Sequence, residues 1–176
     1  MCGQVWQALK CRKRYTNPCK CGFLGDFNNL CTCTPHDIQR YRQRLSGPLL
    51  DRIDLHIDVP RVPYSDLSAT GDGEPSAVIR TRVEAARNIQ RERLNQFGLH
   101  SNSQMQARHI RKFCTVDDQG QQLLEMVTDR LGLSARSYSR ILKVARTIAD
   151  LAGEFQIGHQ HLAEAIQYRG LDRKTV

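Results

Sequence analysis

The sequence lacks any apolar run near the ~18 residues that a membrane-spanning helix needs, and no apolar stretch follows a basic start as in a signal peptide. Aromatic residues are also scarce: they make up 6% of the 176 residues, against 40% hydrophobic and 25% charged residues. This composition is typical of an ordinary globular domain and argues against collagen-like, mucin-like and transmembrane proteins. We therefore expect a cytoplasmic protein with no membrane partner.

The motifs of nucleotide hydrolysis are missing as well. The chain contains no GxxxxGK[ST] loop to cradle phosphates and no apolar strand ending in Asp-Glu to hold magnesium. Its six histidines are scattered, and their positions support no Ser/His/Asp or Cys/His arrangement. We expect that the chain alone does not hydrolyse a nucleotide.

Acidic residues are fewer than basic ones: 18 against 26, which gives a net charge of +8 and a pI of about 9.4. The surplus lies toward the two ends of the chain, because residues 64–100 carry equal numbers of both signs. Such a balance favours polyanionic partners, either nucleic acid or nucleotide phosphate, although exposed arginines without a partner are a common alternative.

The segment 17–33 is rich in Cys, Gly, Asn and Asp, which predicts a compact loop. It contains the pairs Cys19-x-Cys21 and Cys31-x-Cys33. Four thiolates can form a closed, structural zinc site, and a cytoplasmic chain disfavours disulfides. C-x-C is tighter than the usual zinc spacing, so two alternatives stay open: His36 replaces one sulfur, or the thiols are simply reduced.

Helices are predicted over much of the chain. Thr34-Pro35-His36-Asp37 predicts the start of a short helix that ends before Gly47. After a Pro- and Gly-rich linker, the apolar spacing predicts further helices. These cover Ile79 to Ile89, Leu123 to Leu131 with an end at Gly132, a Ser134-capped stretch that ends at Gly153, and Gln160 to Tyr168.

One β-strand is predicted before the linker. Ile53, Leu55, Ile57 and Val59 alternate with polar residues, which is the period-two pattern of a half-buried strand. Arg52 stands at its start, where an arginine can reach a phosphoryl group across an interface or pair with a neighbouring aspartate.

A basic stripe is predicted on the Ser134-capped helix, opposite the apolar seam that starts with Tyr138 and Ile141. An exposed stripe at a helix N-terminus suits phosphate, while a solvated face is the common alternative. The stripe consists of Arg136, Arg140, Lys143 and Arg146.

Five segments between about Asn17 and Arg169 together resemble the C-terminal half of the magnesium-chelatase-like AAA+ ATPases of the ComM/YifB type. In chain order they are NPCKCGFLGD, CTCTP, RYRQRLSGPLLDRIDLHIDVPRV, LSARSYSRILKVARTIADL and HLAEAIQYR. The Cys-Gly loop, the LLDRIDLHIDV stretch and the SAR helix carry the most specific part of the resemblance.

The resemblance implies roles for three residues. Asn17 falls at the sensor-1 position, which orients the attacking water. Arg52 falls at the arginine-finger position, which faces the nucleotide of a neighbouring subunit, and Arg136 falls at the sensor-2 position, which touches the γ-phosphate. The resemblance further implies a hexameric ring that uses ATP and Mg²⁺ and acts on DNA as a helicase in competence.

The expected fold is mainly α. Residues 1–63 are expected to be the C-terminal remnant of an AAA+ αβα core, with one strand and the Cys-rich loop. Residues 64–76 are expected to be a linker, and 77–176 an all-helical lid of the magnesium-chelatase type. The alternative is a stand-alone basic module that contains zinc and binds nucleic acid.

Overall fold

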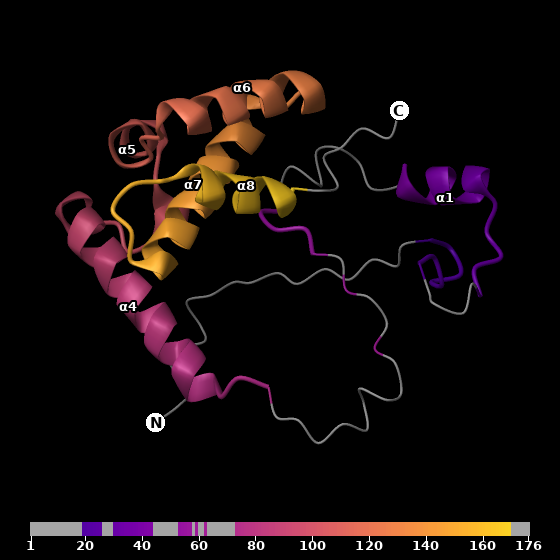
Figure 1. Ribbon diagram of the computed structural model, residues 1–176, viewed down its shortest axis with the longest axis horizontal. Coiled ribbons are helices and arrows are strands. Elements are labelled where there is room, and N and C mark those ends of the chain that lie inside the picture. Colours follow the sequence, from indigo (N-terminus) through magenta and orange to yellow (C-terminus); the bar gives the residue numbers. More distant parts are fainter. Residues whose placement is uncertain are drawn as a thin grey trace. The chain divides into compact units, whose positions relative to one another are not determined.

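The computed structural model describes residues 19–25, 30–43, 53–57, 59, 62 and 73–169, and Figure 1 shows its helices. The chain divides into two compact units, Met1–Leu45 and Ser46–Val176. Within the described ranges the structure is mainly helical and has no β-strand, which confirms a mainly α fold. None of these helices is both long and apolar enough to cross a membrane.

The first unit contains helix α1 (Pro35–Arg42), which begins where the sequence predicts. The Oγ1 of Thr34 accepts a hydrogen bond from the backbone N–H of Asp37, at 3.2 Å. The Asp37 carboxylate in turn accepts one from the backbone N–H of Thr34, also at 3.2 Å. This capping box satisfies two N–H groups that the first helical turn leaves open, and Pro35 supplies a preset φ.

Within its described residues, the second unit is a bundle of five helices and two short 3-10 turns. Helix α7 is its centre and packs against α4, α5 and α8, while α6 packs against α8. In chain order the elements are α4 (Ser76–Leu94), η2 (Asn95–Phe97), η3 (Asn102–Gln104), α5 (Ala107–Phe113), α6 (Asp118–Leu131), α7 (Ala135–Ala152) and α8 (His159–Gln167).

The predicted ends of α6 and α7 are confirmed. Gly132 follows α6 with φ +57°, and Gly153 follows α7 with φ +74°, the left-handed conformation that glycine adopts without a Cβ clash. Ser134 caps α7, because its hydroxyl accepts a hydrogen bond from the backbone N–H of Ser137 at 3.1 Å. The sequence does not single out α5, whose seven residues are too few for a clear apolar period.

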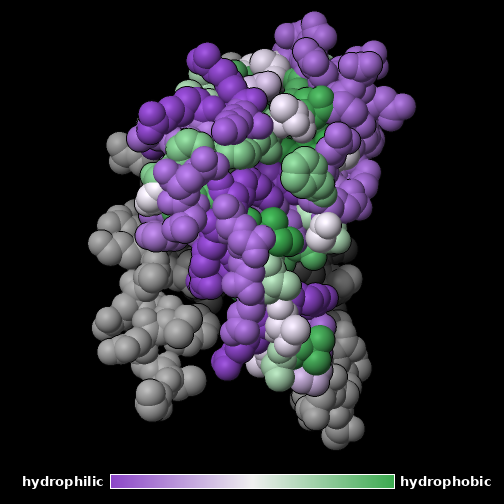
Figure 2. Space-filling view, turned by 90° about the vertical axis from the view of Figure 1, so that its left-hand side faces the viewer, coloured by the Kyte–Doolittle hydropathy of each residue, from purple (hydrophilic) through white to green (hydrophobic). Residues whose placement is uncertain are grey.

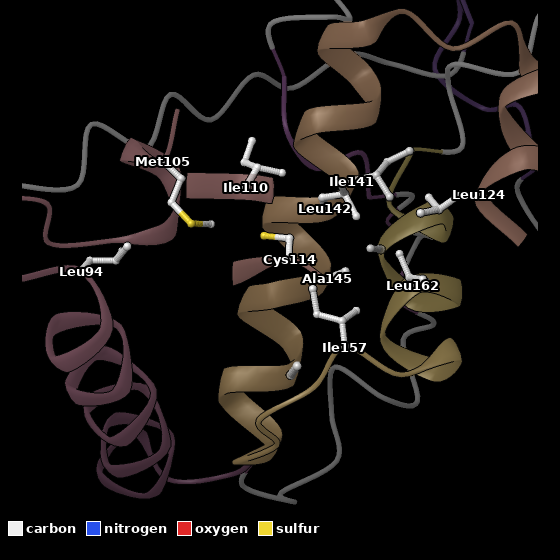
Figure 3. Close-up of a cluster of buried hydrophobic side chains, with 12 residues drawn as sticks. Leu94, Met105, Ile110, Cys114, Leu124, Ile141, Leu142, Ala145, Ile157 and Leu162 are labelled. Atoms are coloured by element: carbon white, nitrogen blue, oxygen red, sulfur yellow. The ribbon is translucent and has the colours of Figure 1, made fainter. Parts of the chain in front are cut away.

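The core of the second unit gathers apolar side chains from its helices and the loops between them (Figure 3). Burial of each large apolar side chain here contributes about 1.5–3 kcal/mol to the free energy of unfolding. The buried members are Leu94, Met105, Ile110, Cys114, Leu124, Ile141, Leu142, Ala145, Ala149, Ile157, Leu162 and Ala165.

Helix α4 only partly joins this core. Residues 76–85 are all exposed, whereas Ala86, Gln90 and Leu94 are buried. Val78, Ile79 and Val83 are therefore apolar residues in contact with solvent. The face of the molecule drawn in Figure 2 is largely hydrophilic, with hydrophobic side chains in small groups.

The predicted strand at 53–59 is wrong for the part that the structure describes. Residues 53–57 form no β-ladder, and Ile57 and Val59 are 67% and 75% exposed. A strand needs a second strand to accept its backbone hydrogen bonds, and no strand is found among the described residues. The segment instead contacts the end of α8, where the backbone N–H of His56 donates to the carbonyl of Tyr168 at 2.7 Å.

Candidate functional site

The four cysteines that the sequence predicts as metal ligands meet in one cluster. The sulfur atoms of Cys19, Cys21, Cys31 and Cys33 all lie within 4.8 Å of one another. The Sγ of Cys19 is 3.3 Å from that of Cys21 and 3.7 Å from that of Cys31. Cys19 is fully buried and the other three are half-buried.

These distances suit a tetrahedral zinc ion. With Zn–S bonds of about 2.3 Å, the sulfurs of a site with four cysteine ligands lie about 3.8 Å apart. His36 is exposed and does not belong to the cluster, so the described residues favour four sulfurs over three sulfurs and one histidine. Such a site has no open position, and a metal held there is structural rather than catalytic.

Two local features bring the cysteine pairs together. Gly22 and Gly25 have φ of +85° and +83°, which turns the chain sharply after the first pair. The backbone N–H of Gly22 donates to the carbonyl of Cys19 and closes that turn at 3.2 Å. The second pair leads directly into the Thr34 cap of α1, so the cluster and the helix share one short piece of chain.

The thiols of the cluster differ in acidity. The backbone of Phe23 hydrogen-bonds to Cys21 and, with the neighbouring thiols, lowers its pKa to about 6. At Cys31 a backbone hydrogen bond from Cys33 acts in the same direction, but burial and the neighbouring thiols outweigh it and raise the pKa to about 11. The thiols of the cluster lie within hydrogen-bonding distance of one another, and a divalent cation bound there would replace their protons.

Cys114, in the second unit, is a different kind of cysteine. It is buried in the apolar core, and burial raises its pKa to about 11. A protonated thiol in this position packs as a small apolar group and is not a metal ligand.

Arg136, the residue predicted to contact phosphate, lies in the first turn of α7 and is exposed. Among the residues that the structure describes, it makes no hydrogen bond or ion pair. Free backbone N–H groups and the positive end of the helix dipole lie at the same end of α7. This is an arrangement in which an anion can bind.

The other three members of the predicted basic stripe have partners, so the stripe is not a free surface. Arg140 pairs with Asp54 at 2.6 Å, and the Nζ of Lys143 donates to the carbonyl of Ser103 at 2.9 Å. Arg146 is 2% exposed and belongs to the core side of the helix. Conversely Tyr138, which the apolar seam includes, is 40% exposed.

The two predicted catalytic residues, Asn17 and Arg52, lie outside the described residues. Ile53, which follows Arg52, is described, and its carbonyl accepts a hydrogen bond from Arg169. Arg169 is 1% exposed and is not among the predicted site residues. An arginine at the end of a predicted helix normally indicates a favourable interaction with the helix dipole, so sequence spacing gives no sign of its burial.

Two protein families match consecutive parts of the chain. Residues 14–67 match the family described as magnesium chelatase, subunit ChlI, and residues 73–169 match magnesium chelatase, subunit ChlI C-terminal. The second match covers more than half of the chain.

Three relatives are similar along most of the chain. The competence protein ComM of Haemophilus influenzae is 46% identical over 159 residues, which are 89% of this chain and 30% of the relative. The uncharacterized protein YifB of Escherichia coli is 43% identical over 91% of this chain and 31% of its own length. An uncharacterized protein of Mycobacterium bovis is 34% identical over 87% of this chain and 30% of its own length.

This chain thus spans about 30% of the length of the curated relatives that it matches. Its helices α4 to α8 lie within the ChlI C-terminal match, and its cysteine cluster lies within the preceding one. The chain belongs to the magnesium chelatase subunit ChlI family.

Proposed function

We propose that the chain supplies the lid and the arginine residues of a ring-forming AAA+ ATPase, in which Arg136 contacts the γ-phosphate of ATP. The observation that carries this proposal is the exposure of Arg136 and its lack of a partner among the described residues. It is exposed at the N-terminus of an 18-residue helix and is the member of the basic stripe for which the described residues provide no partner. A guanidinium fixed at its base and free at its head can bind phosphate oxygens through two hydrogen bonds.

The remaining roles are proposed from the resemblance of the motifs to those of the family. Arg52 would act as the arginine finger toward the nucleotide of a neighbouring subunit, and Asn17 would orient the attacking water. ATP and Mg²⁺ would bind mainly through residues that this chain does not contain, because it has no phosphate loop. Chemistry at the nucleotide would therefore need the rest of a complete subunit.

A chimaera tests Arg136. Residues 14–169 replace the matching segment of the Haemophilus influenzae relative, and ATP hydrolysis is compared with that of the unaltered relative. With the chimaera active, Arg136→Ala is expected to lower kcat about a hundredfold, as the loss of one donor to a transition-state oxygen does. Arg136→Lys keeps a point charge and should recover part of the rate.

Arg111 provides the matched control. It is also an exposed arginine on a helix of the second unit, and the described residues give it no partner. Arg111→Ala is expected to leave kcat unchanged. Equal rates for Arg111→Ala and Arg136→Ala would contradict the sensor role.

We further propose that the cysteine cluster binds one structural zinc ion. The supporting observation is the approach of four sulfurs to within 4.8 Å. Elemental analysis of the purified chain should find one zinc per molecule, and Cys21→Ser should remove it because a site with four cysteine ligands tolerates no lost ligand. Cys114→Ala is the control and should keep the metal.

DNA is the proposed substrate of the assembled ring. The relative from Haemophilus influenzae is named as a competence protein, and this chain carries a net charge of +8. Lys20, Arg40 and Arg42 are exposed beside the cysteine cluster or on α1, so the first unit can contribute phosphate contacts. Binding of the chain to duplex and single-stranded DNA should weaken steeply between low and moderate salt. Unchanged affinity across that range would exclude phosphate contacts.

A further inference from the structure

Arg169 joins two parts of the second unit that are far apart in the sequence. It is 1% exposed and lies just after α8. One terminal nitrogen of its guanidinium donates to the carbonyl of Ile53, and the other donates to the hydroxyl of Ser137 at 3.2 Å. A planar guanidinium fixes the angle between its two acceptors, so it holds them in one geometry.

Each acceptor is next to an arginine with a proposed role. Ile53 directly follows Arg52 in the sequence, and Ser137 directly follows Arg136 in the first turn of α7. The contact between segment 53–57 and the helices is supported twice more. The backbone N–H of His56 donates to the carbonyl of Tyr168, and Asp54 pairs with Arg140.

We propose that Arg169 is a positioning residue that holds the Arg136 end of α7 in register with the segment that follows Arg52. This proposal rests on the proposed function, since only there do the two arginines serve neighbouring nucleotides. Arg169 is only 1% exposed, so its effect on the nucleotide is indirect. Through Arg169, a movement of segment 53–57 would also move the first turn of α7.

Hydrogen exchange on the 176-residue chain tests the tie itself. Two peptides are followed, one covering residues 53–57 and one covering 134–140, with a peptide from α5 as reference. Arg169→Gln should raise exchange about tenfold in both peptides, because a local opening exposes them together, and should leave α5 unchanged. Arg169→Lys donates from a single atom and should give a smaller increase.

A second variant keeps the test decisive if Arg169→Gln disturbs the whole unit. Ser137→Ala removes one acceptor and places a good helix former in α7, so the fold should persist. Exchange at residues 53–57 should rise in this variant as well. No change there, or a rise in only one of the two peptides with Arg169→Gln, would overturn the proposal. Arg130→Gln, at an exposed arginine of α6, is the control and should change neither peptide.

The ATPase chimaera gives the functional readout as a double-mutant cycle. If Arg169 acts through Arg136, Arg169→Gln should lower kcat about tenfold when Arg136 is present and less than about twofold when Arg136 is alanine. A merely structural role would give the same loss in both backgrounds and would overturn the proposal. If Arg136→Ala leaves the rate unchanged, the proposed function fails, and the exchange experiment still decides whether the tie exists.

Discussion

Arg146 and Asp150 form an ion pair on successive turns of α7, with the Nε of Arg146 3.0 Å from the Oδ1 of Asp150 and both side chains buried. Arg146 also donates to the carbonyls of Glu154 and Phe155, in the loop that leads toward α8. Asp150 accepts further hydrogen bonds from Arg93 on α4 and from Asn102 in η3. The pair therefore connects three elements and a loop around a fully hydrogen-bonded carboxylate.

The first prediction concerns this carboxylate. Asp150→Asn removes the negative charge but keeps the shape, which leaves the buried guanidinium of Arg146 and the nearby Arg93 without a counter-charge. Breaking a buried pair in this way costs about 3–5 kcal/mol of the free energy of unfolding. Urea unfolding of the chain, followed by far-ultraviolet circular dichroism, measures the change.

The control for Asp150 is Asp118→Asn, at an exposed position in the first turn of α6. It weakens only a favourable contact with the helix dipole and should cost less than about 1 kcal/mol. A loss at Asp150 no larger than this control would show that the network does not stabilise the bundle.

This network also shows which parts of the structure the sequence can predict. The helix boundaries around Thr34, Gly132, Ser134 and Gly153 follow from caps, whose hydrogen bonds lie within a few residues of chain. The assignment of Arg146 to an exposed stripe fails because it donates to the loop carbonyls of Glu154 and Phe155, and because its partner Asp150 is also bound by Arg93 of α4; the helical period of α7 does not encode these contacts. Burial of a charged residue depends on such contacts between elements.

The predicted strand depends on contacts between distant segments, whereas the cysteine cluster depends on local ones. The alternation from Ile53 to Val59 predicts a strand, but a ladder also requires a neighbouring strand, and the described residues of this segment form none. The cysteines share a short loop with two glycines in the left-handed conformation, so their approach is a local event that the spacing can predict. Asn17 and Arg52 remain predictions, since they lie outside the described residues.

The second prediction concerns pH and His109. Its Nδ1 accepts a hydrogen bond from the backbone N–H of Gln106 and so completes the N-terminal cap of α5, and its ring stacks edge-on against Phe97. Burial, with a smaller effect of Arg108, lowers the pKa of His109 below its usual value. The unfolded chain therefore binds more protons than the folded one as the pH falls below about 6.5, and stability is lost toward acid.

Thermal unfolding between about pH 7 and pH 5 tests this, because an ordinary histidine of the unfolded chain takes up its proton in that window. His109→Asn keeps a hydrogen-bond acceptor without a titrating ring and should flatten the pH dependence. His159→Asn, at an exposed histidine in the first turn of α8, should leave it unchanged. Equal slopes for the unaltered chain and His109→Asn would refute the assignment.

The third prediction concerns close packing at Gly120 in α6. A Cβ at this position would lie 2.7 Å from the Cδ1 of Leu162 and 2.9 Å from the Oδ1 of Asp117. Alanine is a better helix former by about 1 kcal/mol, but overpacking a core contact costs about 1–3 kcal/mol. Gly120→Ala should therefore destabilise the second unit in spite of its helix propensity.

Leu162→Val provides the test of that cause. It shortens the side chain that the new Cβ would meet, so the two substitutions should cost less together than the sum of their separate losses. Strict additivity in urea unfolding would mean that the contact with α8 is not the origin of the effect.

The last prediction concerns metal removal and separates the two units. The cysteine cluster and α1 lie in the first unit, and Cys33 directly precedes Thr34, the N-cap of α1. Withdrawal of zinc by a chelator should raise hydrogen exchange in residues 19–43, since the free energy of metal binding is the free energy that orders so small a loop. Helices α4 to α8 have their own apolar core and should keep their protection.

Cys33→Ser should reproduce the effect of the chelator without any added reagent, and zinc returned in excess should restore protection in the unaltered chain alone. Loss of protection in α7 on chelation, or full protection of α1 without metal, would refute a zinc centre confined to the first unit.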